Sequence, residues 1–370
     1  MLSRVLTLFR LQESGLLAVI VVLGALLAVF GGSVRTPLLT VGPDGIRERV
    51  FATNAAGVRA PVFVQRNKFL NVQNLAQLAK DTSFIAIMAV GASIVIIAGG
   101  IDLSVGAIYA LASVLGAIVF NHFGPDGAAA GSPGAGVVLG MGACVGTAML
   151  CGLVNGGLIV ALRVHPFIIT LGAMAILRGI AFVVTKGQSV GAFPHAFRAM
   201  IGWQTSNGLS LVPPGVMILV TFAGWIFLAR LAAGRRVYAI GGNELAARFS
   251  GIAVERVKIG IYVLSGLSAG IAALLAIGYY GSASSGDGQG YELNVIAAAV
   301  VGGASLTGGR GTALGAVLGA LVIQMISSGI VILGIDQNYS QVIIGAVVIA
   351  AVVLDNFNRW LARRRLARAA

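Results

Sequence analysis

Ten long apolar runs divide this chain of 370 residues and constrain its fold more than any other feature. A helix needs about 20 apolar residues to cross the hydrocarbon core of a bilayer. The sequence therefore predicts an all-α polytopic membrane protein with about ten transmembrane helices and short re-entrant or interrupted segments, in one transmembrane domain over 1–370. The expected spans are 15–32, 83–99, 104–121, 135–161, 166–185, 213–231, 257–280, 291–307, 312–334 and 338–356.

The composition excludes an ordinary soluble globule. Hydrophobic residues make up 58% of the chain and charged residues only 10%, whereas a soluble domain is about a quarter charged. The formal net charge of +13 would suit a nucleic-acid-binding protein. The cations stand at the edges of the apolar runs, however, which is typical of topology signals. We therefore expect membrane lipid, and no nucleic acid, around this chain.

The orientation follows from the positive-inside rule, which keeps Lys and Arg in cytoplasmic connections. Placing both termini in the cytoplasm puts the cation-rich stretch 230–258 and the tail 359–368 inside. Segment 33–68 disagrees, because it lies outside and holds Arg35, Arg47, Arg49, Arg59, Arg66 and Lys68. We interpret it as an extracytoplasmic loop insertion that leads into a short surface helix near Leu70 to Lys80.

Two glycine-rich interruptions between apolar runs have a similar composition. Segments 96–106 and 300–311 each join two apolar runs through glycines and small polar residues, and transporters often contain repeats with interrupted helices at the pathway. The run 291–307 is short and opens with Glu292 and Asn294, so it suits a re-entrant helix as well as a full span.

Glycines at intervals of four predict close helix packing. Gly311, Gly315 and Gly319 follow this spacing, which on a helix forms a flat groove that a neighbouring backbone can approach. A packing role is favoured over a ligand role.

Polar residues between or within the spans are candidates for the pathway or its gate. Asp102 stands between two apolar runs, and charge at membrane depth is expensive and often functional. Asp102 or Ser104 could instead cap the next helix. The outer loop 281–292 could bind a sugar, dock a partner or simply be solvated. The candidates are Asp102, Ser104, Asn155, Tyr291, Glu292 and Asn294.

The cytoplasmic segment 234–256 predicts a short amphipathic helix. Asn243 suits its N-cap, Glu244 its first turn and Gly251 its exit. Such a helix could hold a soluble partner or lie on lipid.

Nucleotide and zinc motifs are absent from the sequence. No P-loop and no His-Glu-x-x-His motif occurs, and the three histidines are scattered. Gly266-Leu-Ser-Ala-Gly270 fits a nucleophile elbow but lies in an apolar run, so we interpret it as packing. We expect no catalytic residue, no metal and no cofactor on this chain.

An ordered set of motifs resembles the ribose-type permeases of bacterial ABC sugar importers, from about residue 68 to 356. The set is Gly99-Gly-Ile-Asp-Leu-Ser-Val-Gly106, Pro166-Phe-Ile-Ile-Thr-Leu-Gly172, Tyr238-Ala-Ile-Gly-Gly-Asn-Glu244, Ser250-Gly-Ile252, Tyr291-Glu-Leu-Asn294 and Gly302-Gly-Ala-Ser-Leu-Thr-Gly-Gly309. Segment 33–68 is longer than this family pattern leads us to expect.

The resemblance implies a permease subunit in the bacterial inner membrane that translocates a monosaccharide. It implies as partners a second permease subunit, a periplasmic sugar-binding protein and a cytoplasmic ABC ATPase that carries ATP and Mg. The segment 243–252 is similar to the family's coupling helix, whose candidate contacts here are Asn243, Glu244, Ala247, Arg248, Ser250 and Gly251.

Two other classes of function remain alternatives from the residues alone. An ion-coupled secondary transporter of a small polar solute would not need an ATPase. An intramembrane hydrolase would need paired catalytic groups at one depth, and the sequence offers no convincing pair.

Overall fold

Eight helices in the described part of the chain are long and apolar enough to cross a membrane. The computed structural model describes residues 11–41, 47–53, 59–205, 208–347, 349–350 and 353. The all-α polytopic prediction is confirmed. The eight helices are α2 (Leu11–Phe30), α3 (Val72–Ile97), α4 (Val105–His122), α5 (Pro133–Leu162), α6 (Pro166–Thr185), α8 (Val212–Arg230), α11 (Val254–Tyr280) and α13 (Ala313–Ile332).

The two remaining expected spans differ from the other eight. The first, 291–307, contains α12 (Tyr291–Val301) of 11 residues, which at 1.5 Å per residue is about 16 Å long and too short to cross the bilayer core. This supports the interpretation as a partial helix. The second, 338–356, follows a 3-10 turn (Gln337–Tyr339) and is helical from 340 to 347, and much of the rest lies outside the described residues.

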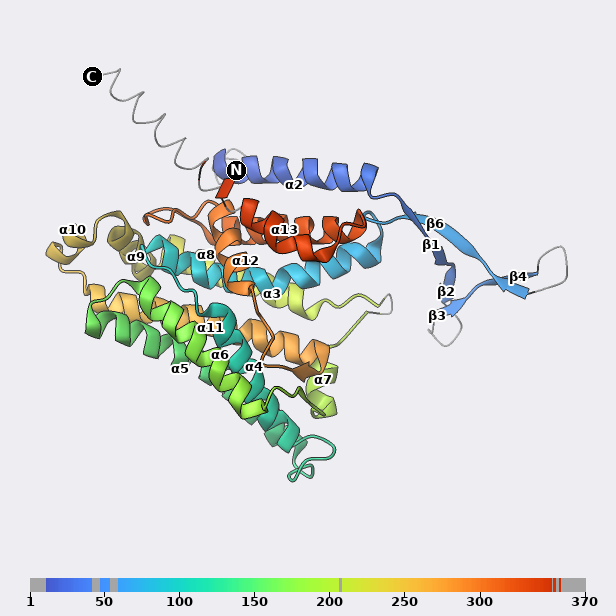
Figure 1. Cartoon of the computed structure of the whole chain (residues 1–370), viewed down its shortest axis with the longest axis horizontal. Coiled ribbons are helices and arrows are strands. Elements are labelled where there is room, and N and C mark those ends of the chain that lie inside the picture. The colour runs from blue at the N-terminus through green and yellow to red at the C-terminus, as the bar shows by residue number, and fades with distance from the viewer. Residues whose placement is uncertain are drawn as a thin grey trace, which may run out of the picture.

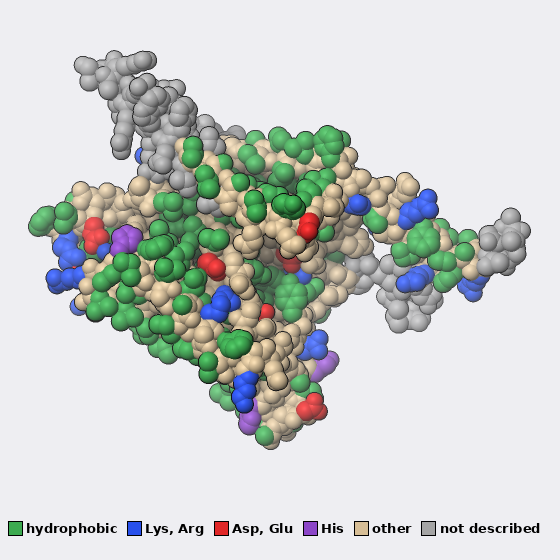
Figure 2. Space-filling view, in the orientation of Figure 1, with side chains coloured by type: hydrophobic (Ala, Val, Ile, Leu, Met, Phe, Trp, Pro, Cys, Tyr) green, Lys and Arg blue, Asp and Glu red, His purple; other side chains and the backbone are tan. Residues whose placement is uncertain are grey.

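Helix α3 forms the centre of the bundle. It is buried along most of its length and packs against α8, α11, α12 and α13 (Figure 1). Helix α5 packs along α11 and α4, while α6 covers α4. By contrast α2 lies at the edge against α13, through a small cluster of Leu27, Phe69, Leu78, Met325 and Ile332. The bundle therefore has a buried middle and broad apolar outer surfaces (Figure 2).

Local signals explain where the helices begin and end. Pro133 and Pro166 occupy the first helical positions of α5 and α6, where a missing N–H costs nothing. The Asn71 side chain caps α3 by accepting the N–H of Asn74. Gly281 ends α11 in the left-handed conformation, with φ of 74°, which glycine adopts without steric cost.

Segment 33–67 is a branched β-ribbon rather than an irregular loop. Its stem pairs β1 (Ser33–Pro37) with β6 (Phe63–Asn67), and two further hairpins pair β2 (Leu39–Val41) with β3 (Arg47–Arg49) and β4 (Phe51–Thr53) with β5 (Arg59–Pro61). The prediction of a separate surface helix near Leu70 to Lys80 is wrong. That stretch is the start of α3, which runs unbroken from residue 72 because no glycine or proline interrupts its first turns.

The short elements gather at the two ends of the bundle. Helices α9 (Ala232–Gly242) and α10 (Glu244–Phe249) lie at one end, and the ribbon and α7 (His195–Ile201) at the other (Figure 1). Beside α7, β7 (Val190–Gly191) pairs with β8 (Ser282–Ala283). The bundle thus separates the charged segment after α8 from the cationic ribbon, as the predicted topology requires.

Two of the three glycines of the expected groove lie in a close contact between helices. A Cβ on Gly315 would overlap the carbonyl oxygen of Gly302, and one on Gly319 that of Ala298, so α13 approaches α12 backbone to backbone. Gly311 lies outside this groove because α13 begins only at Ala313, and its φ is 146°. Its place is the preceding turn, against Ile97 and Ala304.

Candidate functional site: a buried polar cluster and a helix at one end of the bundle

Asp102 is the centre of a buried hydrogen-bond cluster that joins three helices. Its Oδ1 accepts from the N–H and the hydroxyl of Ser104 at 3.0 and 2.6 Å, and its Oδ2 accepts from the hydroxyl of Ser265 at 2.8 Å. Asn155 Nδ2 donates to the Ser104 hydroxyl oxygen at 2.8 Å. All four side chains are at most 2% exposed. The cluster fastens the turn before α4 to α5 and α11 in the interior of the bundle.

The expected helix cap takes a different form. Ser104 is the N-cap residue of α4, but its side chain makes no capping hydrogen bond. The carboxylate of Asp102 accepts from the N–H of Ser104 itself, one position before the helix proper. Two further donors, the Tyr262 and Thr170 hydroxyls, reach the Ile101 carbonyl at 3.3 and 3.4 Å. Asp102 therefore holds the turn in place between helices instead of closing one helix end.

The two glycine-rich interruptions meet in space. The N–H of Gly309 donates to the carbonyl oxygen of Ile97 at 2.8 Å, and a Cβ on Gly241 of α9 would overlap the same oxygen. Ile96, Ala299 and Ala304 form a small buried cluster beside them. Both turns thus lie against α9, which leads directly into α10.

The N-termini of α4 and α12 lie against each other. A Cβ on Gly106 would overlap the Glu292 carboxylate and the Gly288 carbonyl, and the rings of Tyr109 and Tyr291 lie 5.5 Å apart. Glu292 Oε1 accepts from the N–H of Gly290 at 3.2 Å, while its buried Oε2 lacks a partner among the described residues. Tyr291 and Glu292 therefore lie close to the start of α4, which follows the Asp102 turn. Asn294 is half-buried in the first turn of α12.

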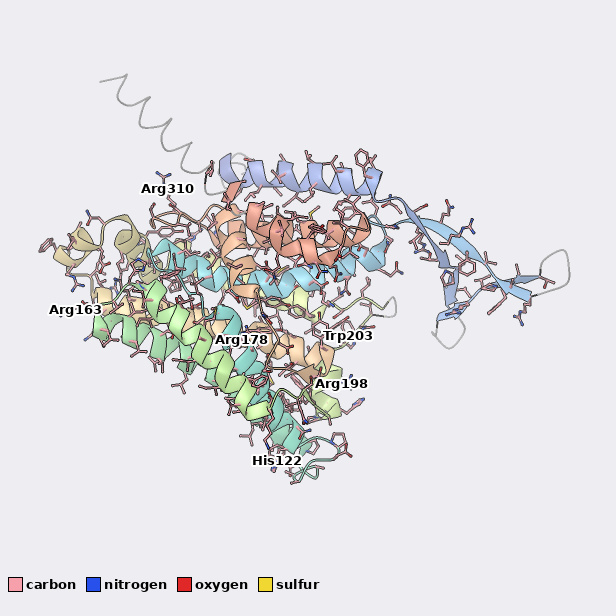
Figure 3. The ribbon with its side chains drawn as sticks, in the orientation of Figure 1. His122, Arg163, Arg178, Arg198, Trp203 and Arg310 are labelled. Carbon is pink, nitrogen blue, oxygen red and sulfur yellow. The ribbon has the colours of Figure 1, made fainter. Side chains whose placement is uncertain are left out.

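Arg178 of α6 holds the loop 281–290, a role that the sequence analysis missed. Its Nη1 donates to the carbonyl oxygens of Ser285 and Asp287 at 3.0 and 3.2 Å, and Figure 3 labels its position beside α6. The signal in the sequence was a lone charge inside an apolar run. Burial raises the pKa of the Asp287 carboxyl, while the Ser284 N–H and the positive charge of Arg178 oppose that shift.

A second missed residue, Lys80, joins α3 to the end of α11. Its side chain is 3% exposed and pairs with Asp81 at 3.0 Å. The ammonium lies 4.2 Å from the ring centre of Tyr279 and 5.0 Å from that of Tyr280, and such cation–π contacts stabilise a desolvated lysine. Lys80 therefore anchors the end of α11 from which the loop 281–290 begins, while Arg178 holds the loop itself.

At the opposite end, α10 is a short helix with well-defined ends. The Asn243 side chain accepts the N–H of Ala246 at 3.0 Å as its N-cap, and the Ser250 hydroxyl donates to the Ala246 carbonyl at 2.9 Å. Gly251 follows at φ of 80° and turns the chain away. Ala247 is buried against Ile240 and Val254. These four predicted residues shape and seat the helix.

Ion pairs brace α10 against α11. Lys258 donates to both carboxylate oxygens of Glu244 at 2.8 Å, and Arg248 pairs with Glu255 and lies 3.8 Å from Glu244. Beside these residues a hollow of about 650 Å³ opens toward Arg163 and Pro166. Glu244 and Arg248 therefore brace α10 while their side chains stay 43% and 50% exposed, and the ATPase contact expected of them stays a prediction.

The apolar side expected of this amphipathic helix faces outward. Phe249 is 88% exposed and Leu245 is 68% exposed, although α10 lies at the end of the bundle and joins the charged α9–α11 connection. Two exposed large apolar side chains one helical turn apart are typical of a surface that a protein partner covers. Their spacing was visible in the sequence, but only the structure shows which side faces outward.

Comparison with known protein families identifies the family of this chain. A model of the family described as the permease component of branched-chain amino acid transport systems matches residues 74–352. The chain belongs to this permease family. It is thus a transport subunit of the bacterial inner membrane and not an enzyme, because a separate subunit of such importers hydrolyses ATP.

Sugar permeases are among its relatives and confirm the ribose-type resemblance. The chain is 38% identical to the ribose import permease protein RbsC of Escherichia coli strain K12 over 290 residues, covering 78% of this chain and 87% of the relative. It is 39% identical to RbsC of Bacillus subtilis strain 168 over 295 residues, with coverage of 80% and 88%. The D-allose transport system permease protein AlsC of Escherichia coli strain K12 is 35% identical over 288 residues, with coverage of 78% and 84%.

Proposed function

We propose that this chain is the translocating subunit of an ABC importer that carries a monosaccharide, such as a pentose, a hexose or a related polyol, into the cytoplasm. A second permease subunit completes the pathway, a periplasmic sugar-binding protein delivers the substrate, and separate ATPase subunits bind ATP and Mg. Both termini lie in the cytoplasm. Family membership and the names of the sugar-import relatives support this proposal.

The single observation that carries the coupling to an ATPase is the shape of α10. A rigid helix transmits force better than a loop, and α10 is capped at Asn243 and braced by Glu244 and Lys258. Its exposed Leu245 and Phe249 can insert into an apolar cleft of the ATPase.

Motion of α10 has a direct route into the bundle. Helix α9 contacts the turn at Ile97 and Gly309, and the turn 98–104 is fastened to α5 and α11 through Asp102 and Ser104. We infer that closing of the ATPases shifts α9 and α10, and that the glycine contacts let the spans move past one another. The sugar then passes between the two permease subunits without any change to its bonds.

The test replaces the outward face of α10 and leaves its braces intact. In the assembled transporter, L245A/F249A should lower sugar-dependent ATPase activity and uptake by about tenfold or more, because a few buried aromatic and aliphatic anchors carry most interface energy. The matched control is L219A/F222A on α8, where Leu219 is also 68% exposed and Phe222 is 57% exposed. Both variants should insert and purify like the wild type.

Two results would contradict the proposal. Undiminished coupling in L245A/F249A would remove α10 as the contact. Uptake that survives ATP depletion but stops with an uncoupler would indicate an ion-coupled secondary transporter instead.

A further inference from the structure

The ribbon 33–67 lies outside the residues that match the permease family, which begin at 74, and it is built on a threefold repeat. Three strands of like sequence recur every 12 residues: Arg35-Thr-Pro-Leu38, Arg47-Glu-Arg-Val50 and Arg59-Ala-Pro-Val62. Each is followed by an apolar residue, Leu39, Phe51 or Phe63. Such regular repetition indicates a defined structure instead of a spacer.

Backbone hydrogen bonds link the three repeats to one another in a ring. The N–H of Leu38 donates to the Val62 carbonyl at 2.7 Å, that of Val50 to the Leu38 carbonyl at 2.8 Å, and that of Val62 to the Val50 carbonyl at 2.8 Å. This ring of hydrogen bonds joins the stem and the two hairpins at one point. The ribbon is therefore a three-branched head with a fixed junction.

The branches present arginine and aromatic side chains together. Arg59 lies 5.3 Å from the ring centre of Phe51, and both residues are exposed. In the stem, Arg35 pairs with Gln65 and Phe63 pairs with Pro37. Because residues two apart on a strand share a face, Arg35 and Phe63 repeat the arrangement of Arg59 and Phe51. Arginine and aromatic residues are the types most enriched at the centres of protein interfaces.

The ribbon carries a strong positive charge, although the proposed topology places it on the extracytoplasmic side, where the positive-inside rule disfavours cations. Segment 33–68 holds six cations against two acids, Asp44 and Glu48, and short loops of this charge normally stay in the cytoplasm. The described side chains of the ribbon show blue and green without red in Figure 2. A cationic outer loop that opposes the topology signal suggests that the charge serves a partner of opposite charge.

The position of the ribbon favours a protein over lipid as that partner. The stem of five residue pairs is about 17 Å long at 3.3–3.4 Å per residue, whereas the headgroup layer of one leaflet is about 5–8 Å thick. Figure 1 shows the stem leaving the end of α2 and pointing away from the bundle at the end opposite α10. Its outer branches thus reach past the headgroups into the outer compartment.

We propose that this three-branched head is a docking arm that binds an acidic surface patch of the transporter's own periplasmic sugar-binding protein. The inference rests on the proposed function, because it assigns a contact to the partner that delivers the sugar. The arm raises the local concentration of loaded binding protein at the outer mouth of the bundle. Translocation itself stays with the helices.

The experiment measures how the ATPase activity of the complete transporter in nanodiscs depends on the concentration of its sugar-loaded binding protein. R35E/R59E should raise the half-saturating concentration about tenfold or more, because charge reversal at an interface costs both attraction and on-rate. The maximal rate should stay unchanged. R35K/R59K keeps the charge and should remain near the wild type.

A deletion variant keeps the test valid if the charge-reversed head fails to fold. The N–H of Lys68 donates to the Gly32 carbonyl at 3.0 Å, so the two ends of the ribbon meet and a short Gly-Ser linker can replace residues 34–66. This variant should show the same raised half-saturating concentration with the same maximal rate.

The outcomes separate the two proposals. A wild-type transporter that the binding protein stimulates, with half-saturation unchanged in R35E/R59E and in the deletion, would overturn the docking arm alone. A charge-reversal effect that disappears in nanodiscs of neutral lipid would also overturn it, since anionic lipid would then be the partner. A wild-type transporter without any stimulation would overturn the proposed function together with this inference.

Discussion

At the scale of single residues, the structure explains why an aspartate stands between two apolar runs. Asp102 accepts three hydrogen bonds, two from Ser104 and one from Ser265, and all of these groups are buried. Buried polar groups are costly when unpaired, so such a cluster is stable only while every member keeps its partner. The carboxylate therefore fixes the position of the turn 98–104 relative to α5 and α11.

Removing that carboxylate should destabilise the protein measurably. In D102A the donors of Ser104 and Ser265 lose their acceptor, and each buried unsatisfied donor costs about 1–3 kcal/mol. D102N keeps an acceptor oxygen and should cost less. Thermal denaturation of the purified permease, followed by size-exclusion fluorescence, measures both effects.

The control for this prediction is S93A. The Ser93 hydroxyl is buried but donates only to the Val90 carbonyl of its own helix at 2.8 Å, so its removal leaves no donor unpaired. Equal thermal stability of D102A and S93A would mean that the Asp102 cluster contributes nothing to stability.

At the scale of elements, the half-helix α12 depends on its contact with α13. Gly315 and Gly319 allow the two backbones to touch, whereas no described residue lies within 4 Å of the Cβ position of Gly142 or Gly146 on α5. The same spacing of four residues therefore serves a packed contact in one helix and an open surface in the other. Only packed glycines are sensitive to added volume.

Adding one methyl group should distinguish these two cases. G319A places a Cβ against the Ala298 carbonyl oxygen, which is backbone and cannot give way, so the helices must separate at a cost of about 1–3 kcal/mol. G142A should be neutral in both thermal stability and sugar uptake. A G319A variant as stable as G142A would show that the backbone contact between α12 and α13 is dispensable.

At the scale of the whole molecule, the proposed topology puts α10 and the ribbon on opposite faces of the membrane. They lie at the two ends of the bundle (Figure 1), and the proposed topology places α10 in the cytoplasm. Both native cysteines are buried and free, so a cysteine introduced on the surface can be labelled selectively.

Cysteine labelling tests this orientation. A membrane-impermeant maleimide should label F63C in intact spheroplasts and F249C only after permeabilisation, since Phe63 is 55% and Phe249 is 88% exposed on opposite sides. The unmodified chain, with Cys144 and Cys151 alone, provides the background. The reverse pattern would invert the topology and place α10 outside, where no ATPase could reach it.

The sequence by itself determined the membrane residence, the all-α class and the approximate limits of the long spans. These properties depend on composition and run length, because a bilayer demands apolar helices of a certain size whatever their neighbours are. The ordered motifs also indicated the ribose-type family before any comparison. The N-cap Asn243 and the helix exit at Gly251 were predictable for the same reason, since capping is a local property.

Tertiary structure decided which partner each polar or small residue meets. Asp102 turned out to bind Ser265, 163 positions away, and Arg178 the carbonyls of loop 281–290, contacts that no local pattern can encode. Likewise Glu244 and Arg248 brace α10 while Leu245 and Phe249 face outward. The ribbon 33–67 needed its junction of Leu38, Val50 and Val62 to form. Burial and facing direction are properties of the packed bundle, so they follow only once the helices are placed.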